Sequence, residues 1–405
     1  MKKILSVFLC VVLIVTATVP SFAVEEKYPL IFVHGMGAWG EGNPLENYVP
    51  NWSDADGNDI IPVLNEKGYE VYNPSLGTFS SAWDRACELY AALTGTVTDY
   101  GEAHSAEAGH SRYGRDYTGN PVMGEPWNLK SPLNFVGHSF GGETIRLLAS
   151  LLTYGDESEK SVSGDECSPL FEGGHGKAVH AIITLSSPHN GSQVANTLVD
   201  PGWTLYFFAA FINILGAVNR IVPIYEPLME QWGLSGEDMT FFNLGVWDAF
   251  ANTKDFCGYE LTLRGAAELN EKIKIDPYAY YYSYTSLCSG TPEFEGVKPD
   301  FSIFLFELSC KDILGSEGEI IDGVEMKDGW IANDGIVPLI SALYPFDDPH
   351  VNFEETKKVE KGLWHVMPTL MGTDHYDFSR GTDFEEGYVE FYINMMDTVN
   401  TNGGK

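Results

Sequence analysis

The sequence predicts an α/β protein, in which helices cover both faces of a mostly parallel central sheet. Short apolar runs typical of buried strands alternate along the chain with segments whose apolar residues recur at helical spacing. No low-complexity linker or repeat divides residues 24–405, and a hydrophobic fraction of 44% can fill a large core. We therefore expect a single domain.

The expected elements follow one another in a regular order. Strands are predicted at residues 28–33, 69–72, 133–136, 179–185, 280–285 and 330–332, and helices at 60–68, 81–93 and 143–154. Gly68 is a stop signal for the first helix, and Ser81 is a suitable N-cap for the second. The tail after Met396 ends in Asn-Gly-Gly-Lys and is expected to be frayed.

Residues 1–23 have the layout of a cleavable signal peptide. Lys2 and Lys3 precede an apolar run, Ile4–Val19, which is followed by the cleavage-like tripeptide Ser21-Phe22-Ala23. A signal anchor is the alternative, but the apolar run is short for a spanning helix. The mature chain is therefore expected to begin near Val24 and to be secreted to the extracellular space.

The chain is strongly acidic, with a formal net charge of −33 that becomes more negative when the leader takes away Lys2 and Lys3. This charge argues against nucleic acid and anionic membranes as partners. An acidic surface can also attract divalent cations, or can serve only solubility. Nothing in the sequence indicates an obligatory protein partner.

Five cysteines follow the leader, at positions 87, 167, 257, 288 and 310. This odd and sparse set, without a Cys-x-x-Cys pair, supports neither a disulfide framework nor a thiolate metal site. Buried free thiols are expected instead.

A Gly-x-Ser-x-Gly pentapeptide, Gly137-His138-Ser139-Phe140-Gly141, lies between the strand at 133–136 and the following helix. In such a strand–turn–helix setting the serine is exposed on a sharp turn as a nucleophile. Both ends are glycine because side chains there would collide with the neighbouring strand and helix. Turns containing serine are also common without catalysis, so the assignment depends on finding partners for Ser139.

An acid and a histidine follow the serine in the chain order typical of the α/β-hydrolase fold. Asp334 lies in an Asn-Asp-Gly sequence, for which a plain Asx turn is the competing interpretation. The histidines beyond it are His350, His365 and His375. We select His375, which lies in a polar segment before the last helix. It would take the Ser139 proton and deliver it to the leaving alkoxide, while Asp334 holds the imidazole tautomer.

The oxyanion formed during acyl transfer needs backbone donors. The candidates are the N–H of Phe140, directly after the nucleophile, and that of Met36, in the loop after the first strand. His34 and His138 are expected to shape these loops rather than to take part in the chemistry.

Further motifs, in order along the chain, make the sequence resemble the staphylococcal and thermophilic-bacillus true lipases. They are Trp83-Asp84-Arg85-Ala86-Cys87-Glu88, Ser168-Pro169-Leu170-Phe171-Glu172-Gly173-Gly174, Ser187-Pro188-His189-Asn190-Gly191 and Gln231-Trp232-Gly233-Leu234. The match runs from Tyr28 to Tyr392. The resemblance implies an extracellular enzyme that hydrolyses triacylglycerols at an oil–water interface, with Ser139, Asp334 and His375 as its triad. It also implies a structural zinc, a calcium site and a mobile helical lid.

Carried over to this sequence, the family's zinc ligands correspond to Asp84, His104, His110 and Glu230. Two imidazoles and two carboxylates make a closed tetrahedral site of the structural kind. Glu230 stands where the family has an aspartate, so its longer side chain would have to fold back to reach the ion. Without the resemblance, the two histidines are only a weak indication of a metal site, and Asp84 could equally stabilise the N-terminus of a helix.

The resemblance also places acidic calcium ligands just beyond the catalytic histidine. Asp377 fits the first position, whereas Asp383 is displaced by one residue from the second. A solvated acidic loop is the competing interpretation, since calcium accepts loose geometry.

The most apolar stretch after the leader is residues 203–222, where the resemblance implies the lid. Apolar residues recur in it at helical spacing: Phe207, Phe208, Phe211, Leu215 and Val218. A lid helix could cover an acyl pocket with this side. The alternatives are a buried core helix and a membrane span, and Asn213, Gly216 and Asn219 argue against the span.

Other functions remain compatible with parts of this pattern. A phospholipase or a short-chain carboxylesterase could use the same triad, because pocket shape sets chain-length and head-group preference. The alternative outside the enzymes is a secreted binding protein that keeps the fold and has lost its catalytic activity. The intact set of Ser139, Asp334 and His375 argues against that alternative.

Overall fold

The computed structural model describes residues 27–54, 56–198, 226, 228–233, 253–289, 314, 317–381 and 387–403. The expected signal peptide, the expected lid at 203–222 and Asp383 lie outside these residues. No helix in the described part of the chain is long and apolar enough to cross a membrane.

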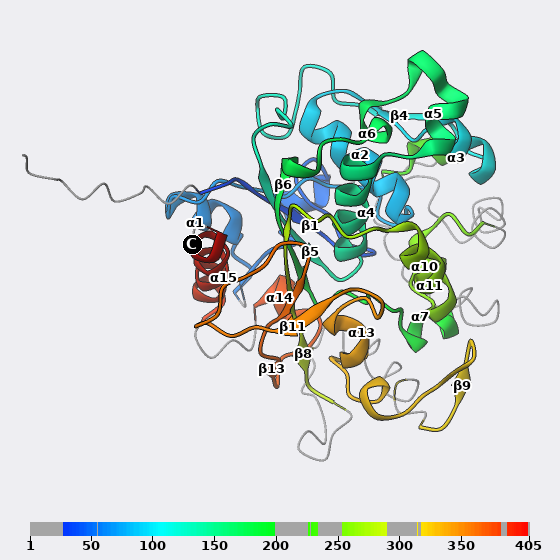
Figure 1. Ribbon diagram of the computed structural model, residues 1–405. Helices are drawn as coiled ribbons and strands as arrows, with labels where there is room; N and C mark the ends of the chain where they lie inside the picture. Colours follow the sequence, from blue (N-terminus) through cyan, green and yellow to red (C-terminus); the bar gives the residue numbers. More distant parts are fainter. Residues whose placement is uncertain are drawn as a thin grey trace, which may run out of the picture.

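A parallel β-sheet forms the centre of the protein (Figure 1). Among the described residues it has seven strands, in the order β11-β12-β7-β6-β5-β1-β2. Their bounds are β1 Leu30–Val33, β2 Val71–Tyr72, β5 Leu133–His138, β6 Val179–Leu185, β7 Tyr280–Tyr284, β11 His350–Asn352 and β12 Trp364–Val366. Every neighbouring pair runs parallel. The loops that follow β1 and β5 therefore meet at one edge of the sheet, where open α/β sheets place their binding sites.

Helices cover both faces of this sheet, as the sequence predicts (Figure 1). On one face, α2 (Ala82–Thr94) and α4 (Gly141–Tyr154) enclose the first core. On the other face, α1 (Ile60–Glu66) and α15 (Tyr388–Gly403) enclose the second core. Adjacent residues of β5 contribute to opposite cores, because successive side chains of a strand point to opposite faces.

The remaining helices and strands are shorter. The 3-10 turns are η1 Pro44–Asn47, η2 Gly164–Glu166, η3 Gly176–Ala178, η4 Glu230–Trp232 and η5 Asp328–Trp330. The helices are α3 Glu102–Ala108, α5 Glu157–Ser163, α6 Pro169–Glu172, α7 Gln193–Leu198, α10 Cys257–Glu260, α11 Leu263–Lys272, α13 Leu339–Leu343 and α14 Asp377–Arg380. The strands are β3 Val97–Asp99, β4 Tyr113–Asp116, β8 Ser286–Leu287, β9 Ile320–Ile321, β10 Val324–Glu325 and β13 Leu370–Met371. The antiparallel pair β3 and β4, with α3 between them in the chain, is an insertion between α2 and β5.

The start of α2 is formed as the sequence predicts. The side chain of Ser81 accepts a hydrogen bond of 3.2 Å from the backbone N–H of Asp84. This bond satisfies one of the free donors in the first turn of the helix. The cap therefore sets where α2 begins, and with it the position of the residues on its first turn.

One predicted strand is wrong. Residues 330–332 do not join the sheet, since the turn η5 ends at Trp330 and Asn333 makes only isolated bridges, to Ser289 and Pro338. The apolar run is explained by a small separate core, in which Trp330 packs with Met326.

The predicted fraying does not begin directly after Met396, and residues 404–405 lie outside the described residues. Helix α15 continues to Gly403. Met396 and Val399 are buried in the second core, so packing holds the helix at least to Val399.

Cys87, Cys167 and Cys257 are free thiols, as expected. Cys87, Cys257 and Cys288 are buried, and Cys167 is partly exposed. Cys310 lies outside the described residues.

Candidate active site and metal cluster

Ser139 lies on a sharp turn between β5 and α4. Its φ is +53°, a left-handed conformation that is strained for a serine, and its N–H donates to the carbonyl of Leu185 over 2.9 Å. A Cβ at Gly141 would lie 2.2 Å from the Val33 carbonyl oxygen, and one at Gly137 would lie 2.6 Å from the backbone of Gly141. The turn therefore requires glycine on both sides of the serine, as the pentapeptide predicts.

Asp334 and His375 form a buried pair. His375 Nδ1 lies 2.9 Å from Asp334 Oδ2, and the two residues are only 2% and 1% exposed. Asp334 Oδ1 accepts from the N–H groups of Ile336 and Val337 over 3.0 and 2.7 Å. The Asx turn and the pairing with histidine therefore occur together at this aspartate.

The environment of Asp334 favours its ionised form. Burial raises the pKa of this carboxyl, but the charge and hydrogen bond of His375 and the N–H groups of Val337 and Ile336 outweigh burial, so the pKa is lowered. An ionised Asp334 accepts the Nδ1–H of His375. The other ring nitrogen, Nε2, is then the one that can accept a proton.

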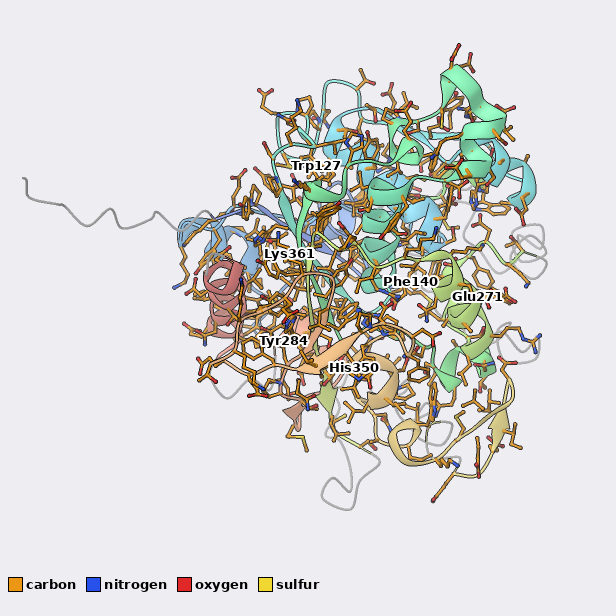
Figure 2. The ribbon with its side chains drawn as sticks, viewed as in Figure 1. Trp127, Phe140, Glu271, Tyr284, His350 and Lys361 are labelled. Atoms are coloured by element: carbon orange, nitrogen blue, oxygen red, sulfur yellow. The ribbon has the colours of Figure 1, made fainter. Side chains whose placement is uncertain are left out.

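Ser139 and His375 line the same cavity, which has a volume of about 290 Å³. Met36 also lines this cavity. Phe140, labelled near the centre of the molecule in Figure 2, is fully buried and precedes the first turn of α4. The cavity also has several apolar lining residues: Trp39, Val194, Ala195, Leu261, Ile336 and Val337. The structure thus brings Ser139, His375 and the Met36 loop to one apolar space.

His34 and His138 hold loops in place, as expected. His34 Nδ1 donates to the carbonyl of Gly35 over 2.9 Å, while its Nε2 accepts the N–H of Leu76 over 3.0 Å. His138 Nε2 donates to the carbonyl of His375 over 2.8 Å. Burial and the charge of His375 lower the pKa of His138 to about 3. His138 is therefore neutral near pH 7 and links the nucleophile turn to the histidine loop.

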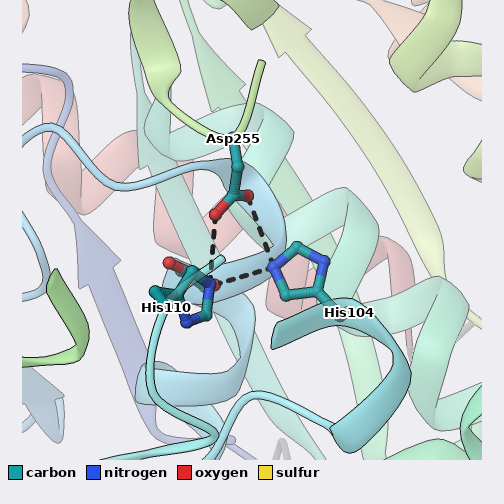
Figure 3. Close-up of side chains that lie close together, drawn as sticks. His104, His110 and Asp255 are labelled. Carbon is teal, nitrogen blue, oxygen red and sulfur yellow. Dashed lines mark hydrogen bonds and ion pairs between the residues drawn. The ribbon is translucent and has the colours of Figure 1, made fainter. Parts of the chain in front are cut away.

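A second group of polar side chains lies on α2 and in the insertion that follows it. Asp84, His104 and His110 meet there with Asp255, and one potential ligand atom from each lies within 4.8 Å of the others. Figure 3 shows His104 and His110 pointing toward Asp255. His104 Nε2 lies 3.1 Å from Asp84 Oδ1 and 3.3 Å from Asp255 Oδ1, and His110 Nε2 lies 3.2 Å from Asp255 Oδ2. This cluster could hold a metal ion.

Neighbouring groups orient the ligands of this cluster. His110 Nδ1 donates to the carbonyl of Ser111 over 2.8 Å, which turns Nε2 toward the centre. The His104 ring stacks on Trp83 with centroids 5.0 Å apart. Gln231 donates to Asp84 Oδ2 over 2.7 Å, so Oδ1 is left to face the centre.

The electrostatics of the cluster fit a cation. His110 Nε2 and Asp255 Oδ2 are buried and face each other over 3.2 Å, but no well-directed hydrogen bond satisfies either atom. Burial lowers the pKa of both imidazoles, but the adjacent carboxylates of Asp255 and Asp84 outweigh burial and raise the pKa of His104 to about 9 and of His110 to about 10. The two carboxylates thus attract positive charge, either as protons on the imidazoles or as a metal ion.

Glu230, predicted as the fourth metal ligand, is not part of the cluster. Its Oε1 accepts a hydrogen bond of 2.5 Å from Arg115, and its side chain is 42% exposed. The backbone turn η4 explains the difference, since it directs Gln231 toward Asp84 and Glu230 away from it. Asp255 supplies the second carboxylate instead. The sequence around Asp255 has no local ligand motif, and only the folded chain brings it to Asp84.

The predicted calcium ligand Asp377 is buried at the start of α14. Its Oδ2 accepts the N–H of Asp374 over 2.7 Å. Burial and the charge of Asp377 raise the pKa of Asp374 to about 7. Within the described part of the chain, one group of three or more side chains is arranged so that it could hold a metal ion, and this is the Asp84 cluster. Asp377 is not a member of it.

The chain is similar to known lipases along almost its whole length. A family model described as "Lipase-like, C-terminal domain" matches residues 26–399. Lipase 2 of Staphylococcus aureus is 36% identical over 371 residues, which cover 88% of this chain and 51% of that protein. The lipase of Staphylococcus hyicus is 33% identical over 392 residues, which cover 92% of this chain and 57% of that protein. The chain thus spans about half the length of these curated relatives.

Two solved structures share its architecture. The structure of EstA from Clostridium botulinum is 31% identical and superposes with a TM-score of 0.78, covering 93% of this chain and 87% of that one. The structure of Staphylococcus hyicus lipase is 30% identical with a TM-score of 0.73, covering 93% of this chain and 96% of that one. Together with the parallel sheet, these matches confirm the predicted α/β-hydrolase fold.

Proposed function

The chain belongs to the family of lipase-like C-terminal domains, and from this premise we propose that it hydrolyses the carboxylic ester bonds of triacylglycerols. One observation carries the proposal. Ser139 and His375 line one apolar cavity, while the buried Asp334 holds the other side of the His375 ring. A serine, a histidine and an ionised aspartate in this relation are the groups that acyl transfer requires.

Each group of the triad has one task in the proposed reaction. Ser139 Oγ attacks the ester carbonyl carbon while His375 Nε2 takes the hydroxyl proton, and Asp334 stabilises the imidazolium. The resulting oxyanion accepts hydrogen bonds from the backbone N–H groups of Met36 and Phe140. When the tetrahedral intermediate collapses, His375 gives the proton to the departing alkoxide, and the acyl group stays on Ser139.

Water completes the cycle. His375 takes a proton from a water molecule, whose oxygen attacks the acyl carbon. Collapse of the second tetrahedral intermediate returns the proton to Ser139 and releases a fatty acid. The buried Asp334–His375 pair argues against a binding protein that has lost its catalytic activity. A protein that only binds lipid would not need a histidine oriented by an aspartate.

The substrate class follows from the cavity. Its apolar lining suits the acyl chain of an ester better than it suits a polar substrate group. We propose a lipid ester presented at an oil–water interface, with residues 203–222 as the lid. A phospholipase or a short-chain carboxylesterase would use the same triad, so the substrate profile distinguishes these activities.

We further propose that the Asp84 cluster holds a structural zinc ion. The ligands would be Asp84, His104, His110 and Asp255, a set of two imidazoles and two carboxylates that suits tetrahedral zinc. None of these residues is among those that line the cavity of Ser139 in the described part of the chain. Zinc would therefore tie α2 to the insertion and to the segment before α10, and would supply stability rather than a step of the reaction.

The proposal also includes a calcium site and secretion of the mature chain. Asp377 and Asp383 would contribute to a calcium site beyond the catalytic histidine. The layout of residues 1–23 supports export of the mature chain to the extracellular space.

A substrate profile tests the proposed function. Purified mature protein would be assayed on a series of p-nitrophenyl esters, emulsified triacylglycerols and phospholipid vesicles. We expect turnover of long-chain esters and triacylglycerols. Hydrolysis confined to short soluble esters, or to phospholipids, would replace the proposal with one of the two alternative activities.

A further inference from the structure

The Arg85 side chain is buried in the first turn of α2 and joins three separate segments of the chain. It is 0% exposed. Its Nε donates to Thr144 Oγ1 over 3.0 Å, and its Nη1 donates to the carbonyl of Gly77 over 3.0 Å. Its Nη2 donates to the carbonyl of His34. Each of the three guanidinium nitrogens thus donates to an acceptor inside the protein, and the group does not reach the surface.

Two of these contacts lead to the two backbone donors of the proposed oxyanion hole. The His34 carbonyl precedes the Gly35–Met36 peptide, which carries the Met36 N–H. Thr144 accepts from Arg85 and donates its own hydroxyl proton to the carbonyl of Phe140 over 3.2 Å. The guanidinium carbon also lies 5.6 Å from the centre of the Phe140 ring. A single side chain thus reaches both sides of the oxyanion hole.

These two sides must approach each other closely. A Cβ at Gly35 would lie 2.7 Å from the Ser139 Cβ, so the two loops are already as near as a glycine allows. The hydrogen bonds of an oxyanion hole depend on donor positions to a fraction of an ångström. A rigid planar group with several donors is suited to hold two loops at a set separation.

The charge of Arg85 is not cancelled by direct contact. No described carboxylate lies within ion-pair distance of its guanidinium, whose acceptors are carbonyl and hydroxyl oxygens. Burial lowers the pKa of Arg85 to about 10, so it is still charged near pH 7. The charges of Glu88, Glu143 and Glu260 offset only part of the cost of burying the Arg85 cation, and an apolar side chain would pack α2 without this cost. Packing alone therefore does not explain an arginine here.

We propose that Arg85 is a positioning residue of the oxyanion hole, holding the Gly35–Met36 turn and the Phe140 turn at the separation that the oxyanion requires. The inference rests on the proposed function and adds a residue to it. Because the oxyanion develops only in the transition state, loss of this support lowers kcat and leaves KM nearly unchanged. A residue that served stability alone would instead lower the melting temperature without this selective loss.

The test compares two pairs of variants on a soluble p-nitrophenyl ester, well below the melting temperature. Arg85→Met removes the donors but keeps much of the volume, and Arg85→Lys keeps the charge with fewer donors. Thr144→Val removes the hydroxyl that joins Arg85 to the Phe140 carbonyl and leaves the contacts of Arg85 to Gly77 and His34 in place. Its matched control is Thr98→Val, since Thr98 is also fully buried but its hydroxyl has no hydrogen-bond partner.

For Arg85→Met we expect kcat to fall about 10- to 100-fold, with KM within about twofold of wild type. Arg85→Lys should recover part of the loss, and Thr144→Val should show a smaller fall in kcat. Affinity for an alkylboronic acid, which forms a tetrahedral anion on a catalytic serine, should fall in parallel with kcat. Thr98→Val should match wild type in both measurements.

The outcomes separate this inference from the proposed function. If wild-type protein does not hydrolyse the ester, the proposed function fails, and the inference fails with it. If wild type is active while folded Arg85→Met and Thr144→Val keep its kcat and boronate affinity, only the role of Arg85 is wrong. If Arg85→Met does not fold, Thr144→Val against Thr98→Val decides the question by the same two measurements.

Discussion

Asp334 and His375 are joined twice, once through their side chains and once through their backbones. Nδ1 of His375 lies 2.9 Å from Asp334 Oδ2, and the backbone N–H of His375 donates to the Asp334 carbonyl over 2.9 Å. The double connection fixes the imidazole relative to the carboxylate before any substrate arrives. Such preorganisation is what a general base requires.

Asp334→Asn should reduce kcat by up to ~10⁴-fold, because an amide at this position can donate to Nδ1 and favour the wrong imidazole tautomer. The fold should survive, since the side-chain oxygen still accepts from Val337. Steady-state kinetics on a soluble ester check this result. Asp116→Asn, at an exposed position on β4, is the matched control and should behave as wild type. Near wild-type kcat in Asp334→Asn would remove Asp334 from the triad.

The buried carboxyl Glu88 should make stability depend on pH. Burial raises its pKa to about 8, against about 4.3 in an unfolded chain. Between these values the folded protein holds a proton that the unfolded chain releases, so the unfolding free energy falls as pH rises, by up to about 1.4 kcal/mol per pH unit.

Glu88→Gln tests this pH dependence. Glutamine can accept the Gly77 N–H and donate to the Tyr100 hydroxyl, the groups that now contact the carboxyl. Urea unfolding between pH 5 and pH 8 should show a flatter slope for this variant than for wild type. The exposed Glu66→Gln should leave the slope unchanged, and an equal slope in all three proteins would contradict the assignment.

The metal site predicts about one zinc ion per chain, held by Asp255 rather than Glu230. Asp255→Asn should lower both the zinc content and the melting temperature, whereas Glu230→Gln should keep both. Chelation should lower the melting temperature before it lowers the initial rate at low temperature, because the ion serves the fold. Elemental analysis and thermal unfolding of the two variants provide the measurements. Full zinc content in Asp255→Asn would contradict the corrected ligand set.

The proposed lid predicts that activity depends on an interface. Opening a lid over an acyl pocket would expose on the order of 400 Å² of apolar surface, which costs up to ~10 kcal/mol in water. A lipid surface removes most of that cost, so it should select the open state. Hydrolysis of a partly soluble triacylglycerol should therefore rise steeply above its solubility limit.

Phe211→Asp should weaken this rise while leaving the hydrolysis of soluble short esters unchanged. Comparing the two substrates controls for any effect of the substitution on the triad, since the triad hydrolyses both. Ordinary saturation through the solubility limit, with the variant equal to wild type on both substrates, would assign residues 203–222 to the core.

The sequence could predict the fold and the position of Ser139 because both depend on local patterns. Alternating apolar runs predict a parallel sheet, and the two glycines around Ser139 follow from the space at a strand–helix turn. The strand at 179–185 was predicted at its observed bounds, since its buried residues are continuous.

Features that depend on distant contacts could not be predicted in this way. Asp255 joins Asp84 only in the folded chain, and its neighbours in the sequence carry no ligand motif. The run at 330–332 has the composition of a strand, but packing of Trp330 in a separate core decides its conformation. The role proposed for Arg85 likewise depends on acceptors from three remote segments.

Active-site labelling of the purified mature protein with a serine-reactive alkyl phosphonate tests whether Ser139 is the nucleophile. We expect one label per chain, located on Ser139 by peptide mass spectrometry, with ester hydrolysis lost in proportion to labelling. Ser139→Ala should take no label and should lose hydrolysis, apart from a residual rate of at most ~10³–10⁴-fold over water. Hydrolysis near the wild-type rate by Ser139→Ala, or a label on another residue that accounts for the lost activity, would show that Ser139 is not the nucleophile.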